Sequence, residues 1–459
     1  MVTMRRRDFL RTTAASAAFA IVGLSRKSGR ADSPSRARRV LIINAGGGLR
    51  TTAAFNASTQ QRLNPWGILG TAGVLRLGSV LRLSESSVTY SASSWASGGS
   101  VPNIQQAAAS FALIAGADHS PDGSARAGDH NDDTPRMGTG YFGKSDAPGL
   151  LTLINRHLGS AAPAPVATIG GGDFGTAPPA WVSDRPIGLS YNQLPSNPPM
   201  GGSALVGQPL EDALDARSLA VHKNLAHDAV QSLVNTKATL RKFGPVLADK
   251  RLRFDSDTYL TQSLDGITNE MILEAVGNAS TAPRDGGARD VALAIRLLQL
   301  GSPAVSVSIG GFDTHDHEVE KAPALYTRFA RFVAGVHYAL GRIPDPAGGM
   351  LLDHTLVVTT SEFGRSGVDG GFNAGDGTDH GGNPGWRYQA HVAFGAGVVP
   401  KKLHPTDDNN VPVDRPASTH CLLATIAAAV GVPSDAIDAE WPTGTSLYPE
   451  GGPLWDLWA

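Results

Sequence analysis

Five short apolar runs are spaced along the chain, at residues 40–43, 166–169, 305–309, 356–360 and 391–394. The runs are rich in β-branched residues and mostly continuous, with little alternation of apolar and polar side chains. Continuous runs of this length are typical of strands covered on both faces, as in a parallel sheet between helices. We therefore predict five strands of a buried sheet.

Helical periodicity occupies the intervals between these runs. Apolar residues recur at helical spacing over residues 150–158, 291–300 and 325–340. Gly301 follows the second of these segments and Pro303 comes two residues later, a combination typical of a helix end. The alternation of helices and strands predicts an α/β fold, an α/β/α sandwich with a mostly parallel central sheet.

Three intervals depart from this alternation. Residues 209–282 are polar and helix-rich with no strand signal, which predicts a helical insertion packed against the sheet. Residues 85–148 and 171–205 are dense in Ser, Gly, Pro, Ala and Asn, which predicts long loops. Loops of this length either lack order or build a site.

The first 31 residues have the order of an export signal. An arginine-rich start is followed by Phe9 and Leu10, by an uncharged apolar run at residues 12–24 and by Ala31. The paired arginines before Phe-Leu resemble the twin-arginine signal, whose translocon accepts folded proteins. We expect cleavage after Ala31, which would leave residues 32–459 as a single domain in the periplasm or outside the cell.

The apolar run of this segment bears on a membrane anchor. It is far shorter than the ~20 residues that a spanning helix needs, so we expect no permanent membrane span. The alternative interpretation of the segment is a disordered basic tail.

Charge and cysteine content restrict the partners and the site. Without residues 1–31 the chain keeps 32 Lys and Arg and 40 Asp and Glu, a balance of -8. An acidic chain without basic clusters is not expected to bind nucleic acid or anionic lipid, because phosphate contacts need Lys or Arg. Cys421 is the only cysteine and lies in an apolar stretch, where we expect a buried, inert thiol. A metal site would therefore use oxygen and nitrogen ligands.

The strongest candidate for chemistry begins where the 305–309 run stops, in Gly-Gly-Phe-Asp-Thr-His-Asp-His. In sheets of this kind, ligands bind outside the carboxyl ends of the strands. Asp313, His315 and His317 offer ligands suited to Zn, Mn or Fe. The alternative is a polar turn with solvated histidines.

A second candidate follows the next run in the same way. Residues 356–360 lead into Ser-Glu-Phe-Gly-Arg, and a glycine-rich loop then reaches Gly-Thr-Asp-His-Gly. Glu362 follows a buried strand, Arg365 has the geometry to hold an anionic ester through two hydrogen bonds, and Asp379 with His380 is another ligand pair. A salt bridge between Glu362 and Arg365 at the rim of the sheet is the alternative.

These three motifs in this order make the chain recognisable. They resemble the bacterial exported family known as DUF1501, a sulfatase-like branch of the alkaline phosphatase superfamily. The resemblance covers residues 297–397, and family members commonly carry a twin-arginine signal. The spacing of Asp313 and His317 also resembles a metal-ligand pair of alkaline phosphatases.

The resemblance implies an alkaline phosphatase-like core with one or two divalent metal ions (Zn, Mn or Ca) and hydrolysis of a phosphate or sulfate ester. In such sites the metal polarises the ester while an arginine stabilises charge on the transferring group. Arg365 is the position implied for the anion. The positions implied as metal ligands are Asp313, His315, His317, Glu362, Asp379 and His380.

The chain departs from the family pattern after the first strand. Members of the superfamily usually place an acidic metal ligand there, whereas this chain has Asn44-Ala-Gly-Gly-Gly. The glycine turn could present backbone N–H groups to an anion, and Asn44 could donate one neutral oxygen. The departure puts a full two-metal centre in doubt.

The nucleophile is the second departure. Residues 129–140 resemble the nucleophile segment of sulfatases, but they contain no cysteine. Thr134 is the candidate nucleophile, and His130, Asp132 and Asp133 are possible ligands. An acidic loop that caps the next helix explains the same residues equally well.

Three functions are compatible with these residues. The leading hypothesis is an exported metal-dependent hydrolase of the sulfatase and phosphatase type, acting on a small-molecule or polymer-borne anionic ester. The alternative is a non-catalytic relative that binds a cell-surface polymer or a partner protein. A metal-dependent oxidoreductase with redox iron is a third, weaker interpretation.

Overall fold

The computed structural model describes most of the chain beyond residue 35. The described residues lie within one compact unit, Ser35–Ala459. They are residues 36–82, 103–119, 130, 137–138, 148–171, 184–192, 194, 238, 242–277, 285–315, 317–365, 387–440 and 454–459. The predicted export signal, residues 1–31, lies outside them.

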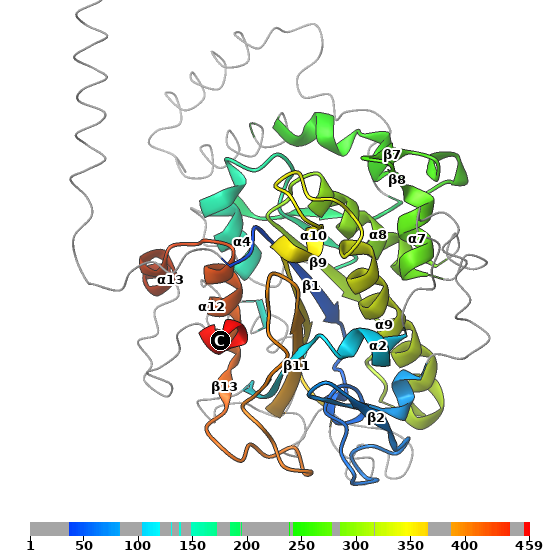
Figure 1. Cartoon of the computed structure of the whole chain (residues 1–459), viewed down its shortest axis with the longest axis vertical. Helices are drawn as coiled ribbons and strands as arrows, with labels where there is room; N and C mark the ends of the chain where they lie inside the picture. The colour runs from blue at the N-terminus through cyan, green and yellow to red at the C-terminus, as the bar shows by residue number, and fades with distance from the viewer. Residues whose placement is uncertain are drawn as a thin grey trace, which may run out of the picture. The chain divides into compact units, whose positions relative to one another are not determined.

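A nine-stranded sheet forms the centre of this unit (Figure 1). From one edge to the other its order is β12 (Lys402–Leu403), β4 (Ala112–Asp118), β11 (Tyr388–Phe394), β10 (Thr355–Ser361), β1 (Arg39–Ala45), β9 (Ala304–Ile309), β5 (Ala167–Ile169) and β6 (Ile187–Leu189), while β13 (Ala417–Ser418) also pairs with β4. Among these strands only β11 runs antiparallel to its neighbours. The predicted α/β fold with a mostly parallel sheet is thus confirmed. The carboxyl ends of β1, β9 and β10 consequently share one edge.

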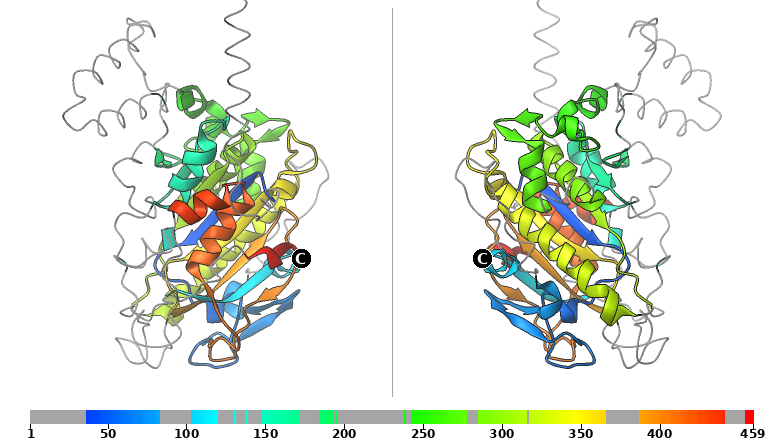
Figure 2. Two further views of the ribbon diagram at one scale, coloured as in Figure 1. Left: turned by 90° about the vertical axis from the view of Figure 1, so that its left-hand side faces the viewer. Right: turned by 90° about the vertical axis from the view of Figure 1, so that its right-hand side faces the viewer.

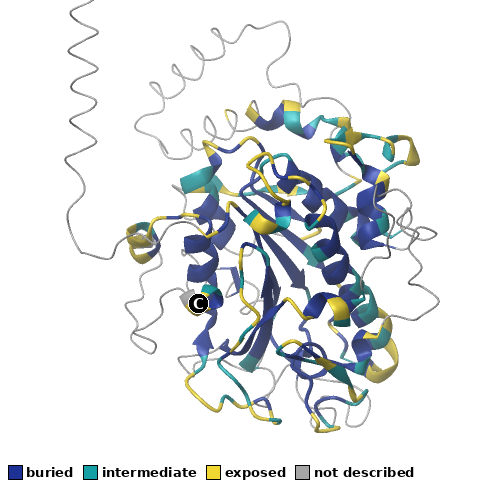
Figure 3. Ribbon diagram, in the orientation of Figure 1, coloured by how far each residue is buried: buried dark blue, intermediate teal, exposed yellow. Residues whose placement is uncertain are grey.

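Helices cover both faces of the sheet (Figure 2). Along β1, Leu41 and Ile43 belong to one apolar core and Val40 and Ile42 to the other, because successive side chains of a strand point to opposite faces. The helices of the first core are α2 (Ile104–Ala108), α7 (Asn269–Val276), α8 (Gly286–Gln299) and α9 (Glu318–Leu340). Those of the second are α4 (Leu150–Ile154), α12 (Thr419–Ala429) and α13 (Ser434–Glu440), with the π-helical turn Asn155–Gly159 continuing α4. The strands are buried between these layers (Figure 3).

Smaller elements complete the described chain. They are the hairpins β2 (Ile68–Ala72)–β3 (Leu75–Gly78) and β7 (Ser263–Leu264)–β8 (Ile267–Thr268), helix α10 (Leu351–His354), and the 3-10 turns Thr51–Ala53, Ser79–Leu81, Lys250–Leu252, Asp257–Tyr259 and Trp455–Trp458. No helix of the described residues has the length and apolar composition needed to cross a membrane.

All five predicted strands and all three predicted helices are present, and two intervals differ from their predictions. Helix α2 and strand β4 lie within residues 85–148, which were predicted as loop. β4 is rich in Ala and Gly, so its pattern is weak, but every residue in it is buried. The β7–β8 hairpin lies within 209–282, where no strand was predicted. Residues 209–237, 239–241 and 278–282 of this interval lie outside the described part.

Candidate metal centre

The turn after β1 forms the base of the site. Gly47 and Gly48 have φ angles of 108° and 93°, which side chains other than glycine rarely adopt. A Cβ on Gly47 would collide with the backbone of Asp313, and one on Gly48 with the ring of Phe363. The glycine run of the sequence is therefore required both for its backbone conformation and for close approach to the segments after β9 and β10.

Hydrogen bonds join this turn to the end of β10. The N–H of Gly47 donates to Oε1 of Glu362, and the N–H of Leu49 donates to Oγ of Ser361 over 2.7 Å. The backbone N–H predicted to receive an external anion thus holds a carboxylate of the protein. Glu362 is 6% exposed, so the surrounding chain fixes its position.

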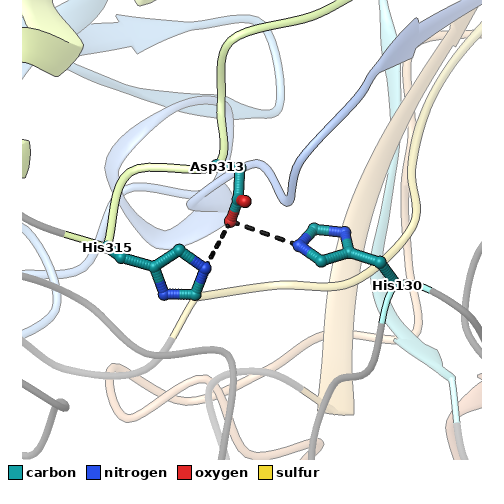
Figure 4. A group of neighbouring side chains, drawn as sticks. All are labelled: His130, Asp313 and His315. Atoms are coloured by element: carbon teal, nitrogen blue, oxygen red, sulfur yellow. Dashed lines mark ion pairs between the residues drawn. The ribbon is translucent and has the colours of Figure 1, made fainter.

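His130 and His315 converge on Asp313 (Figure 4). The Nε2 atoms of His130 and His315 lie 3.2 Å and 2.9 Å from Oδ1 of Asp313. Nδ1 of His130 also lies 3.2 Å from Oε1 of Glu362, so this imidazole touches both carboxylates. The three side chains come from two segments far apart in the sequence, and each is accessible, with 37%, 43% and 41% exposure for His130, His315 and Asp313.

The geometry of this trio, which we call the His130 cluster (His130, Asp313 and His315), fits a metal ion. One ligand atom from each residue lies within 4.8 Å of the others. Ligands held at about 2.0–2.1 Å by a tetrahedral ion lie about 3.3 Å apart, close to the two separations from Asp313. Two imidazoles and a carboxylate are ligands of Zn, Mn and Fe, whereas Ca prefers oxygen throughout. In the absence of metal, the same contacts are ion pairs for a protonated imidazole.

Electrostatics keep Asp313 in the form that a metal requires. Partial burial raises the pKa of Asp313, and the hydrogen bond and the charge of Arg365 lower it. His130 and His315 lower this pKa further, and the net value lies below the usual 3.8. The carboxylate is therefore ionised at neutral pH.

Arg365 lies beneath the cluster with a fully buried side chain. Its Nη2 donates to Oδ1 of Asp313 over 2.7 Å, to the carbonyl of Phe312 over 2.8 Å and to the carbonyl of Gly47. Its Nε donates to the carbonyl of Gly48 over 3.2 Å. Arg365, which was predicted to bind an anion, thus donates hydrogen bonds to four oxygen atoms of the protein itself. Among the ion pairs of the described residues, Arg365 pairs with Asp313, and the alternative Glu362–Arg365 salt bridge is not among them.

The other predicted site residues are placed in different ways. His317 precedes α9 in a left-handed conformation (φ 50°) and is not one of the three residues of the His130 cluster. Asn44 accepts a hydrogen bond from Thr360 (3.1 Å) and donates one to Ser308 (3.3 Å), so its amide bridges neighbouring strands. Three predicted site residues lie outside the described residues. They are the candidate nucleophile Thr134 and the ligand pair Asp379 and His380.

A cavity of about 20 Å³ is lined both by residues of the 129–140 segment and by Asn44. Met137 and Gly138 line it together with Asn44, Ser306 and Thr360. Two residues of the 129–140 segment therefore pack beside the carboxyl end of β1.

The ligand set implied by the resemblance omitted His130. The sequence feature that pointed to this histidine was the acidic run Asp-His-Asn-Asp-Asp in which it lies.

Comparison with known proteins gives one family match. Residues 248–439 match the model of the family described as "Protein of unknown function (DUF1501)". The match includes Asp313, His315, Glu362 and Arg365 and leaves His130 outside. No curated protein matches the chain.

Solved structures show only remote likeness. A crystal structure of Ps i-CgsB in complex with k-i-k-neocarrahexaose has a TM-score of 0.34 and 13% identity, covering 91% of this chain and 77% of that one. The lipoteichoic acid synthase LtaP from Listeria monocytogenes has a TM-score of 0.33 and 9% identity, with 92% and 81% covered. TM-scores below 0.5 do not establish a common fold.

Proposed function

We propose that this protein is a divalent-metal-dependent hydrolase of anionic esters, of the sulfatase and phosphatase type. The observation that carries the proposal is the convergence of His130, Asp313 and His315 at the carboxyl ends of strands. This is the edge at which ligands of such sheets bind. The three side chains are each partly exposed, and Nε2 of His130 is itself buried.

The roles of the residues follow from their contacts. His130, Asp313 and His315 would hold the ion, and Glu362 would orient His130 through the contact between Oε1 and Nδ1. When bound, a divalent ion polarises the ester for attack. Thr134 is the proposed nucleophile, and Asp379 with His380 the proposed source of further ligands. The substrate is an anionic ester, either small or carried on a polymer.

The metal content of the purified mature protein tests this proposal. The wild type is compared by elemental analysis with the double variant His130→Ala, His315→Ala. His404→Asn is the matched control, because His404 has a similar left-handed backbone (φ 48°), which Asn tolerates, and lies outside the predicted ligand set. One or two equivalents of Zn, Mn or Fe in the wild type and the control, lost in the double variant, would support the proposal and justify assays with phosphate and sulfate esters. No stoichiometric metal in the wild type would overturn it.

Two observations favour the binding protein as the second candidate. Arg365 donates to protein oxygens, and Asn44 stands where the superfamily that the chain resembles usually carries an acid. Such a protein would bind a cell-surface polymer or a partner without turning it over. Metal binding without hydrolysis of any ester in a broad panel would favour it.

Export through the twin-arginine translocon to the periplasm or beyond is the proposed route to the site of action. Arg6 and Arg7 followed by Phe9 and Leu10 support it. The double variant Arg6→Lys, Arg7→Lys should accumulate in the cytoplasm at full length. Undiminished export of this variant would exclude the route.

A further inference from the structure

The buried guanidinium of Arg365 connects the two turns that build the site. Its acceptors are the carbonyls of Gly47 and Gly48 after β1 and the carbonyl of Phe312 after β9, together with the carboxylate of Asp313. A guanidinium is planar and presents its N–H groups in fixed directions. One side chain therefore sets the distance between the glycine turn and the Asp313 turn.

The same contacts extend to the second carboxylate. The carbonyl of Gly47 accepts from Arg365 and its N–H donates to Glu362, so the two peptide groups that flank this residue are both held. Glu362 in turn contacts Nδ1 of His130. A displacement of Arg365 would thus reach Asp313 directly, and Glu362 and His130 through Gly47.

Charge supports the same role. Asp313 and Glu362 place two negative charges around one imidazole, and like charges at short range repel strongly in a partly buried site. Arg365 supplies a buried positive charge in contact with Asp313. The side chain is fully buried, and an anion at Nε or Nη2 would have to replace contacts to backbone carbonyls, which are costly to leave unpaired when buried.

We infer that Arg365 is a positioning residue that holds the glycine turn and Asp313 in the geometry for metal binding, and that it does not bind the substrate anion. The inference rests on the proposed function for the presence of a metal. The part that concerns the two turns is independent of it. The anion would then be bound by the metal and by groups other than Arg365.

Two variants of Arg365 and one control separate these roles. Arg365→Lys keeps the charge and loses the planar donors, while Arg365→Gln loses the charge. Arg39→Gln is the control, because Arg39 forms a buried ion pair with Asp345 (2.5 Å) at the opposite end of β1. Three measurements are made. The first is the affinity for Co²⁺ and the visible spectrum of the bound ion without substrate, and the second is the affinity for inorganic sulfate and phosphate. The third is amide exchange of residues 46–50 and 312–315 in the metal-free protein.

We expect Arg365→Gln to weaken Co²⁺ binding by about 10–100-fold and to alter the spectrum, as the loss of an outer-shell partner does. Amide exchange in both turns should accelerate in both Arg365 variants, while Arg39→Gln should affect neither the spectrum nor these amides. Unchanged spectrum, Co²⁺ affinity and exchange, with a tenfold loss of sulfate or phosphate affinity, would overturn the inference. If the wild type binds no Co²⁺, the proposed function fails, and unchanged exchange in the two turns would then overturn the inference separately.

Discussion

Nε2 of His130 lies 3.2 Å from Oδ1 of Asp313, and Nδ1 of the same ring lies 3.2 Å from Oε1 of Glu362. One imidazole therefore bridges the two carboxylates that follow β9 and β10. A ring nitrogen bound to a carboxylate leaves the other nitrogen oriented for a metal, an arrangement common in metalloproteins. Glu362 suits the orienting role because the N–H of Gly47 holds it in place.

Replacement of His130 tests this arrangement directly. His130→Ala should reduce Co²⁺ affinity by at least about tenfold, because it removes a ligand and the partner of Glu362. Isothermal titration of the metal-free variant gives the affinity, with His404→Asn as the control. An affinity equal to that of the wild type would show that His130 lies outside the metal site.

Glycine at position 47 is expected to be indispensable to the site. Gly47→Ala should lower the free energy of unfolding by about 1–3 kcal/mol for its backbone conformation, with an added cost for the collision with Asp313. The variant should also lose metal binding, because the collision displaces Asp313.

Gly67→Ala is the matched control for this substitution. Gly67 also has a positive φ (79°), but a Cβ there has no atom within 4 Å. It should show the conformational cost alone, with metal affinity intact. Equal losses of stability in the two variants, measured by urea denaturation, would contradict a role for close packing at Gly47.

The sequence predicted the centre of the sheet well because its strands carry continuous apolar runs. β1, β9 and β10 are of this kind, and their common direction brings Asp313 and Glu362 to one edge. β4 was missed because Ala and Gly give a weak strand pattern, although its burial is complete. α12 is buried on almost every side, so periodicity does not distinguish it from a strand.

The site was less accessible to prediction than the fold. Asp313 and Glu362 can be located from the sequence because each follows the end of a predicted strand. His130 does not follow a predicted strand, and only tertiary packing brings it to Asp313. The commitment of Arg365 to backbone carbonyls was also hidden, because a sequence does not show which acceptors a buried donor will meet.

The buried histidine of β11 should make stability depend on pH. Burial lowers the pKa of His391 to about 4, with a smaller opposing effect from its bond to the carbonyl of Thr359. The unfolded chain titrates near 6.5, so it takes up the proton first on acidification. The stability that the neutral imidazole contributes is complete above pH 6.5 and declines as the pH falls towards 4, by up to about 3 kcal/mol.

His391→Gln tests this dependence, because glutamine stays neutral over that range. The free energy of unfolding of the variant should fall less between pH 7 and pH 4.5 than that of the wild type. His420, whose pKa burial also lowers to about 4, should add a similar effect in the double variant His391→Gln, His420→Gln. Parallel pH profiles for all three proteins would contradict the assignment.

Asp290 on α8 should have the opposite dependence. Burial raises the pKa of Asp290 to about 6, and the charge of Asp285 adds to the rise against the opposing effects of the Tyr191 N–H and Arg328. The folded chain therefore holds a proton that the unfolded chain releases near pH 3.8. The stability linked to this proton is complete below pH 3.8 and is lost as the pH rises through 6.

Asp290→Asn should consequently stabilise the protein at pH 7.5, because it removes the cost of a buried carboxylate and keeps an oxygen to accept from the N–H of Tyr191 (3.1 Å). The gain in melting temperature should shrink as the pH falls below 6. Asp285→Asn should instead destabilise at pH 7.5, since Asp285 pairs with Arg328 at 2.5 Å. The contrary result would be a melting temperature of Asp290→Asn that lies below that of the wild type by the same amount at pH 7.5 and at pH 5. This result would show that the carboxylate contributes only a hydrogen bond and that its burial has no electrostatic cost.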